Sequence, residues 1–571
     1  MQSSRAEARQ GQGQFAALMA VAVLLIVLLS LLPMLRLVKE LVAPGGTLSA
    51  AALAAGLASR STWIATWHTL VVGLGGTMLA VLSGTLVALL VTLTDLRRRG
   101  LLVLCYVTPL MIAPQVTALA WLQLFGPASP LLRLLGVAPP LGARNPLYSA
   151  EGIILLLGVQ YGPLVFLVVR AGLRKLPREL VEAARATGAG WPRVVATVVL
   201  PLMTPSIVAA AALAFVSCVG NFGIPAFLGI PANYLVLPTL IYQRLAGGGP
   251  AALGETAFLS VLIGVIAIAG ILAQETVSRR RDYRVASVSL PAEPYELGRW
   301  RMPVEACMWL FAVLVLAMPL LGLALTSLVS GYGVVLSAAT ATLDNYRFVL
   351  FEHAAAGRAF VNSVWLSALA ATFAVVVAVP MGYLVAWGGG GRWIRLLSLA
   401  VELPYALPGV VLAIAALLLF LRPVPLVGLQ LYNTPWIILY AYMARFLVLA
   451  LRPAVSGYHQ IDRALEEAAQ VAGAGLFTRM RTIVFPLVAP AAIAGGLLIF
   501  MTALGELTVS ALLWSSGSET IGVVMFSFEQ GGDSGYAAAM SMITVALTFA
   551  LMLLASLLAP YLPDGVLPWR D

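Results

Sequence analysis

The sequence is poor in charged residues and has no long hydrophilic domain. Only 10% of its 571 residues are Asp, Glu, Lys or Arg, whereas 61% are hydrophobic and the mean hydropathy is +0.97. A water-soluble chain of this length cannot bury so much apolar surface, so lipid must solvate much of it. The apolar runs are continuous rather than alternating, which favours helices over a β-barrel. We therefore expect an all-α integral membrane fold.

Cysteine, histidine and lysine are also scarce. The three cysteines, Cys105, Cys218 and Cys307, are too few and too dispersed for a disulfide framework or a metal site, and the three histidines show no ligand spacing. Neither of the two lysines, Lys39 and Lys175, stands in the Gly-Lys-Ser/Thr of a P-loop. We expect no catalytic residues, no metal and no cofactor in this chain. The net charge of +10 reflects arginines retained on loops rather than a nucleic-acid partner.

Twelve apolar runs are long enough to cross a bilayer, which takes about 20 residues. Four prolines, early in the third and ninth runs, predict kinks or breaks there: Pro109, Pro114, Pro404 and Pro408. The runs lie at 15–37, 66–92, 101–125, 151–171, 197–219 and 255–277, and then at 303–328, 360–387, 396–421, 434–453, 486–512 and 536–560.

The positions of lysine and arginine predict the orientation. With the N-terminus in the cytoplasm, 24 of the 34 fall on cytoplasmic loops and tails, and Arg445 alone lies inside a span. The first apolar run, from Phe15 to Leu32, lacks a small-residue cleavage site, so we interpret it as a span. We expect a multi-pass protein of a bacterial inner membrane with both termini in the cytoplasm.

The chain repeats itself at about half its length. The Glu-Ala-Ala segment at 182–184 returns 285 positions later at 467–469, and the same offset relates Gly220 to Gly505. Elsewhere the offset drifts, so that Ala113-Pro114 resembles Leu407-Pro408 at an offset of 294. An even number of spans per unit gives two parallel halves related by an axis along the membrane normal. We divide the chain into a first half at 1–277, a cytoplasmic linker at 278–302 and a second half at 303–571.

Both loops between the fourth and fifth spans, 178–201 and 463–486, share the pattern E-A-A-x3-G-x9-[I/V]-x-[L/F]-P. Small helix-forming residues followed by Gly and Pro predict a short helix, a sharp turn and a second helix along the cytoplasmic face, with the proline in the first turn of the next span. The main positions are Glu182, Ala183, Ala184, Gly188 and Pro201 in the first loop, and Glu467, Ala468, Ala469, Gly473 and Pro486 in the second.

This pattern resembles the EAA loop of ABC import permeases of the binding-protein-dependent type. The resemblance covers essentially the whole chain and extends to the fused permeases of ferric iron, thiamine and 2-aminoethylphosphonate importers. It implies that the two loops carry coupling helices, which dock two copies of a separate ABC ATPase. ATP and Mg would then belong to the ATPase, and a periplasmic solute-binding protein would deliver the solute to a pathway that works by alternating access.

Polar residues inside the spans are candidates for the pathway. We expect Glu402 and Arg445 to pair or to share a polar pocket, as a structural pin or as part of the pathway. The resemblance places the fifth span of each half along the pathway, where four residues are candidates for the outer vestibule. For Glu506 a capped, solvated helix end is an equal alternative. The four residues are Asn221, Ser217, Glu506 and Thr502.

The solute and one rival class stay open at this stage. Ferric iron is the first choice, from the resemblance and from a carboxylate at Glu506, and 2-aminoethylphosphonate, thiamine and polyamines are alternatives. A major-facilitator-type secondary transporter also has twelve spans in two parallel halves, but it would carry no EAA loops. A membrane scaffold or receptor has no large soluble domain here to support it.

Overall fold

The computed structural model describes residues 2–43, 51–248, 252–279, 295–388, 391–423 and 428–558. These residues are helical apart from connecting turns and two isolated β-bridges, and no strand is assigned among them. Among these residues, ten helices are long and apolar enough to cross a membrane, and two bent helix pairs raise the number of candidate spans to twelve. The expected all-α membrane fold is confirmed. Most of the expected linker, residues 280–294, lies outside the described residues.

The first half contains six spans, two of which include a π-helical turn. Short helices precede or follow them at α3 (Ala51–Ala58), α7 (Pro130–Leu134), α9 (Arg178–Ala186), α12 (Gly223–Leu228) and α13 (Leu237–Gly247). The spans are α1 (Gln2–Ile26) with η1 (Val27–Leu31) and α2 (Leu32–Val42); α4 (Arg60–Leu93); α5 (Arg99–Met111) with α6 (Pro114–Phe125); α8 (Ala150–Leu173); α10 (Trp191–Val194) with η3 (Val195–Val199) and α11 (Leu200–Val219); and α14 (Ala252–Arg279).

The second half repeats this order. Its shorter elements are η4 (Gly298–Trp300), α17 (Asp344–Arg347), η6 (Phe348–Glu352), α22 (Ala464–Val471), α25 (Ser510–Leu513) and α26 (Ile521–Gly531). The spans are α15 (Arg301–Ala312) with η5 (Val313–Ala317) and α16 (Met318–Ser327); α18 (Ala354–Trp387); α19 (Arg392–Ala406) with α20 (Gly409–Phe420); α21 (Pro435–Gln460); α23 (Leu476–Arg479) with η7 (Met480–Val484) and α24 (Phe485–Leu504); and α27 (Ser534–Leu558).

The third span of each half is broken rather than straight. The axes of α5 and α6 meet at 102°, and so do those of α19 and α20. Each break lies just before a proline, Pro114 or Pro408, where the preceding residue is extended as proline requires. The predicted break is therefore confirmed in both halves, whereas Pro109 and Pro404 lie inside α5 and α19.

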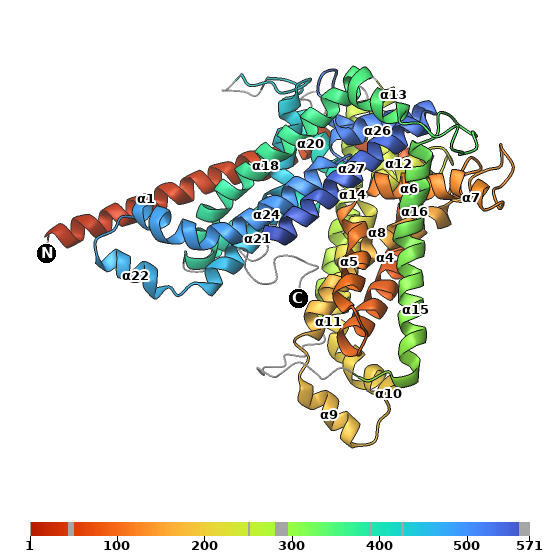
Figure 1. Ribbon diagram of the computed structural model, residues 1–571. Coiled ribbons are helices and arrows are strands. Elements are labelled where there is room, and N and C mark those ends of the chain that lie inside the picture. The colour runs from red at the N-terminus through yellow and green to blue at the C-terminus, as the bar shows by residue number, and fades with distance from the viewer. Residues whose placement is uncertain are drawn as a thin grey trace.

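The two halves form two arms that meet at one end and diverge toward α9 and α22 at the other (Figure 1). The first span of each half packs against the other half. The first-half helix α2 packs against α20, and the second-half helix α16 packs against α6. In Figure 1 the red helix α1 accordingly lies along the arm of α18, α21 and α24, and the green helix α15 lies along the arm of α4 and α5.

Equivalent hydrogen bonds in the two halves show that the repeat extends to single contacts. In the first half the Leu237 amide donates to the Thr69 hydroxyl at 2.8 Å. In the second half the Ile521 amide donates to the Ser363 hydroxyl at 2.9 Å. Both bonds tie the start of a short helix, α13 or α26, to the second span of the same half.

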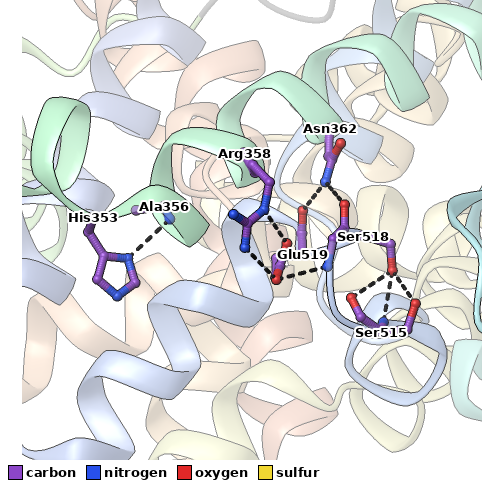
Figure 2. A network of polar contacts seen from close by, with 8 residues as sticks. His353, Ala356, Arg358, Asn362, Ser515, Ser518 and Glu519 are labelled. Carbon is purple, nitrogen blue, oxygen red and sulfur yellow. Dashed lines mark hydrogen bonds and ion pairs between the residues drawn. The ribbon is translucent and has the colours of Figure 1, made fainter.

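Beside this shared bond the second half carries an ion pair (Figure 2). Arg358 of α18 contacts the carboxylate of Glu519 at 3.1 Å, and the amide group of Asn362 donates to the carbonyl oxygens of Gly517 and Glu519 at 3.1 and 3.0 Å. The first half uses aromatic rings at this place, where His68 stacks on Tyr234 at 3.7 Å.

Candidate functional site

The two EAA loops lie at the free ends of the arms, far from the place where the arms meet (Figure 1). In each loop the short helix, α9 or α22, is followed by a glycine with positive φ, +81° at Gly188 and +83° at Gly473. An added Cβ would meet nothing within 4 Å at either glycine, so the backbone conformation alone accounts for the residue type. The predicted helix and turn are present in both loops.

The part of each loop that follows the turn differs from the prediction. The second helix does not lie along the cytoplasmic face, because it is the beginning of the fifth span. That span runs without a break from Trp191 to Val219 in the first half and from Leu476 to Leu504 in the second. Pro201 and Pro486 therefore lie ten residues inside a continuous helix, each just after a π-helical turn. A π turn leaves room for a residue that cannot donate a backbone hydrogen bond.

The motif side chains are presented outward on both loops. Glu182, Ala183, Glu467 and Ala468 are exposed, whereas Ala184 and Ala469 are half-buried. Around the motif, α9 exposes Leu180, α22 exposes Leu465 and Val471, and α23, after the turn, exposes Phe477. A surface of small and apolar side chains on two short helices suits a docking contact with another protein.

Different contacts stabilise the inside of each loop. In the second loop Glu466 and Arg479, 4% and 7% exposed, form a buried ion pair, and the Tyr383 hydroxyl donates to Glu466 at 3.1 Å. At the equivalent positions of the first loop, 285 residues earlier, Val181 and Val194 are buried in an apolar cluster. Sequence reasoning missed this pair, although the repeat offset would have placed both residues on the inner side of the hairpin.

Each loop also contacts the beginning of the other half's first span. Gln14 of α1 accepts a hydrogen bond from the Leu476 amide at 2.9 Å, at the start of the second half's fifth span. In the first half Tyr295 stacks on Trp191 with ring centroids 4.9 Å apart, just before α15. The first span of each half therefore reaches from the opposite arm's loop into the membrane.

An acidic side chain adds to this contact on the first half. Asp95 accepts a hydrogen bond from the Leu297 amide at 3.0 Å and lies 3.3 Å from Arg301. The Leu297 amide, together with the positive charge of Arg301, lowers the pKa of Asp95 below its ordinary value.

The arms meet at a reciprocal contact, which we call the junction. An added Cβ on Gly220 would lie 3.2 Å from the Cα of Pro408, and an added Cβ on Gly505 would lie 2.8 Å from the Cβ of Ala113. Each half thus presses the end of its fifth span against the break in the other half's third span. The side chain of Gln115 adds a hydrogen bond across the junction to the Gly505 carbonyl oxygen.

Asn221 and Glu506 follow these two glycines and cap the next short helices. Asn221 accepts from the Ile224 amide at 2.9 Å and donates to the Tyr161 hydroxyl at 2.8 Å. Glu506 accepts from the Val509 amide at 2.9 Å. Asn221 and Glu506 are only 5% and 8% exposed, so in this state they lie inside the closed junction rather than along an open vestibule.

The other two vestibule candidates lie one turn lower on the fifth spans. Ser217 is half-buried and Thr502 is exposed. Each hydroxyl donates to a carbonyl oxygen four residues earlier, at 2.8 and 2.7 Å. They occupy equivalent positions in the repeat, 285 residues apart.

The expected pair of Glu402 and Arg445 is not formed. Glu402 instead makes an exposed ion pair with Arg452 at 3.1 Å. The break after Ala406 explains the difference. Glu402 lies on α19, before the break, beside Arg452, whereas Arg445 lies seven residues, roughly 10 Å, from Arg452 along α21. There the Arg445 guanidinium lies against Gly409, at the start of the upper limb α20.

Comparison with known proteins identifies the chain. The family of binding-protein-dependent transport system inner membrane components matches it twice, over residues 76–283 and 378–566. The chain belongs to this family. It is thus a permease of ABC importers, with two family domains fused in one multi-pass chain of the bacterial inner membrane, and the secondary-transporter alternative is set aside.

Three relatives show the range of this permease family. A probable ABC transporter permease protein, y4fN of Sinorhizobium fredii, is 27% identical over 520 residues, which cover 89% of each chain. The ferric transport system permease protein FbpB of Actinobacillus pleuropneumoniae is 22% identical over 78% of this chain and 64% of its own length. A putative 2-aminoethylphosphonate transport system permease protein, PhnV of Salmonella paratyphi A, is 28% identical over 36% of this chain and 76% of its own.

Proposed function

We propose that this permease is the membrane pathway of a complete importer, with two copies of a separate ATPase docked on α9 and α22. A periplasmic binding protein delivers the solute at the opposite face, above the junction. Both termini lie in the cytoplasm, on the side of the EAA loops. The observation that carries the proposal is the geometry of the arms. Their joined ends form a closed junction, and their free ends carry the two exposed EAA loops.

The mechanism follows from that geometry. When the ATPase dimer closes, α9 and α22 move toward one another, and each loop is continuous with a fifth span that ends at the junction. Movement of the loops therefore changes the contacts of Gly220 with Pro408 and of Gly505 with Ala113. ATP binding favours the state in which these contacts open outward, and hydrolysis restores the state described here.

Reversing the charge of the EAA glutamates tests this proposal. We expect Glu182→Lys and Glu467→Lys, alone and together, to abolish ATP-driven uptake in proteoliposomes that contain the partner ATPase and binding protein. Glu352→Lys, at an exposed glutamate that is paired with Arg347 in the segment just before α18, is the matched control for docking and should leave the affinity for the ATPase unchanged. Uptake by the permease without any ATPase would overturn the proposal.

For the solute we propose ferric iron as the first choice from the sequence, supported by the ferric-transport name of one relative. An oxyanion such as 2-aminoethylphosphonate is the second candidate, and the structure adds an observation in its favour, because the Glu506 carboxylate is engaged as a helix cap while Arg445 nearby makes no ion pair among the described residues. The ligand of the partner binding protein decides between them. A binding protein that takes an anion and no metal ion rules out iron.

A further inference from the structure

Arg445 lies in the middle of α21 with part of its guanidinium buried. Among the described residues it makes no ion pair, and its one aromatic contact is with the adjacent Phe446, whose ring centroid lies 5.8 Å away. The side chain is half-buried, and its Nε and Nη1 atoms are inaccessible to solvent and have no hydrogen-bond partner among the described residues. Arginine stays charged under all physiological conditions, so this position keeps a positive charge inside a membrane span. Such a charge is costly unless something binds it.

The acidic groups near Arg445 are already engaged. Glu402 pairs with Arg452. Glu506 lies close enough to act electrostatically on Arg445, but its oxygens accept hydrogen bonds from the amides of Val509 and Ser510 at 2.9 to 3.2 Å. No ion pair joins Glu506 to Arg445 among the described residues.

The guanidinium lies at the junction rather than on the lipid-facing side of its arm. Nη1 occupies the place where a side chain on Gly409 would begin, 1.4 Å from an ideal Cβ. Gly409 follows Pro408, the residue in contact with Gly220 of the other half. Tyr161 of the first half is also within electrostatic reach of Arg445. Arg445 therefore presents its charge where the two arms meet.

In the first half, the residue equivalent to Arg445 has a structural role. Gln160, 285 residues earlier, donates to the carbonyl oxygens of Pro109 and Ile112 at 2.9 and 3.1 Å. These bonds satisfy the last carbonyls of α5 at the break. Arg445 makes no such bond at the break between α19 and α20, so its cation is not needed to close the broken helix.

We propose that Arg445 binds an oxyanion group of the transported solute (a carboxylate, phosphate or phosphonate) as the solute passes the junction. The planar guanidinium offers N–H donors that match such a group, and the residue is half-buried rather than fully enclosed. The inference rests on the proposed importer function and, of the two solutes proposed there, favours the oxyanion over ferric iron.

Site-resolved arginine labelling tests the contact on the intact protein. The full-length permease in nanodiscs is treated with an arginine-specific dicarbonyl reagent, and each arginine is followed by peptide mass spectrometry. Inorganic phosphate or methylphosphonate should slow labelling of Arg445 at least several-fold relative to chloride at equal ionic strength. Arg452, exposed and paired with Glu402, is the internal control and should show no such protection. Equal protection of both arginines, or none, overturns the proposal.

Substitution tests the same contact during transport. Arg445→Gln gives the second half the residue that the first half carries at this position, so the fold should tolerate it. In proteoliposomes with the ATPase and binding protein, we expect the KM for uptake to rise about tenfold, with an intermediate rise for Arg445→Lys and no loss of thermal stability. An unchanged KM overturns the inference alone. Uptake that does not require the ATPase overturns the proposed function instead.

Discussion

At the scale of single residues, the repeat lets one half serve as the control for the other. Glu466 and Arg479 form a buried ion pair in the second EAA loop, where the first loop has Val181 and Val194. Both solutions fill the same inner face of a helical hairpin. The charged solution requires both partners, because either one alone would leave an uncompensated charge in an apolar setting.

This comparison gives a stability prediction. Glu466→Val should destabilise the protein by about 3 to 5 kcal/mol, because Arg479 is left buried without its partner. The double variant Glu466→Val with Arg479→Val reproduces the first loop and should recover most of that loss. Thermal unfolding of the purified permease in nanodiscs measures both. A double variant no more stable than the single one would contradict the explanation.

A second ion pair predicts a dependence on pH at the opposite face. Burial alone would raise the pKa of Glu519, but hydrogen bonds from Arg358 and the Gly517 amide outweigh burial and lower that pKa below its ordinary value. A lowered pKa means that the pair stabilises the fold above the ordinary glutamate pKa and that this contribution is lost as the pH falls through the folded-state value.

Glu519→Gln should therefore lower the melting temperature at neutral pH by an amount equivalent to about 1 kcal/mol, since Arg358 is half-exposed and screened by solvent. The difference between wild type and variant should shrink steadily as the pH falls below the ordinary glutamate pKa. Melting curves over a pH series check this. A difference that grows in acid would reverse the assigned sign.

At the scale of elements, much of the arrangement could be predicted from the sequence. Apolar runs indicate the spans, the repeated Glu-Ala-Ala-x3-Gly spacing indicates the two short helices with their turns, and Pro114 and Pro408 indicate the broken spans. These features are local, since each depends on residues close together in the chain. The extension of the fifth span back to Trp191 and Leu476 was missed, because a π turn before proline has no simple residue signature.

Pairing between elements was harder to predict. Glu402 was expected to pair with Arg445 as another polar residue inside the spans, but the third span bends by 102° after Ala406 and Glu402 lies beside Arg452 instead. The ion pair of Glu466 with Arg479 was missed for a similar reason, because it depends on how the hairpin folds back. Sequence patterns indicate where a residue lies along its helix, whereas its ion-pair partner depends on how the helices are oriented relative to each other.

The turn glycines give a prediction with an internal control. Gly188→Ala and Gly473→Ala should each cost about 1 kcal/mol in the loop, because alanine resists positive φ although its Cβ would meet no atom. Gly190→Ala, two residues on at φ −65° and equally uncrowded, should be neutral. Affinity for the proposed ATPase partner, measured by titration in nanodiscs, should fall for the first two and stay constant for Gly190→Ala. Loss of affinity in all three would point to bulk rather than backbone conformation.

At the scale of the whole molecule, the exchange of first spans binds the two halves together. Helix α2 packs on α20, and α16 packs on α6, so each half buries its first span on the other. Neither the apolar runs nor the repeat could predict this exchange, because a span in lipid has no single apolar face that indicates its neighbour.

We therefore expect the halves to associate without a covalent connection. If the chain is expressed as two polypeptides divided within the linker at 278–302, the halves should co-purify as a 1:1 complex that resists high salt, because apolar helix packing rather than surface charge joins them. Each half expressed alone should be poorly stable. Size-exclusion chromatography with mass determination distinguishes these results, and a stable, monodisperse single half would contradict the exchange.

Holding both halves in one polypeptide also fixes which residues can face each other at the junction. An assembly of two identical second halves would hold two arginines at position 445, related by the symmetry axis, and two like charges in a poorly polarisable medium repel each other. Fusion guarantees that each assembly holds an arginine at position 445 in one half and a neutral amide, Gln160, at the equivalent position of the other. A fused chain can therefore hold a positive charge in one half only, whereas a homodimer of single halves could not have this asymmetry.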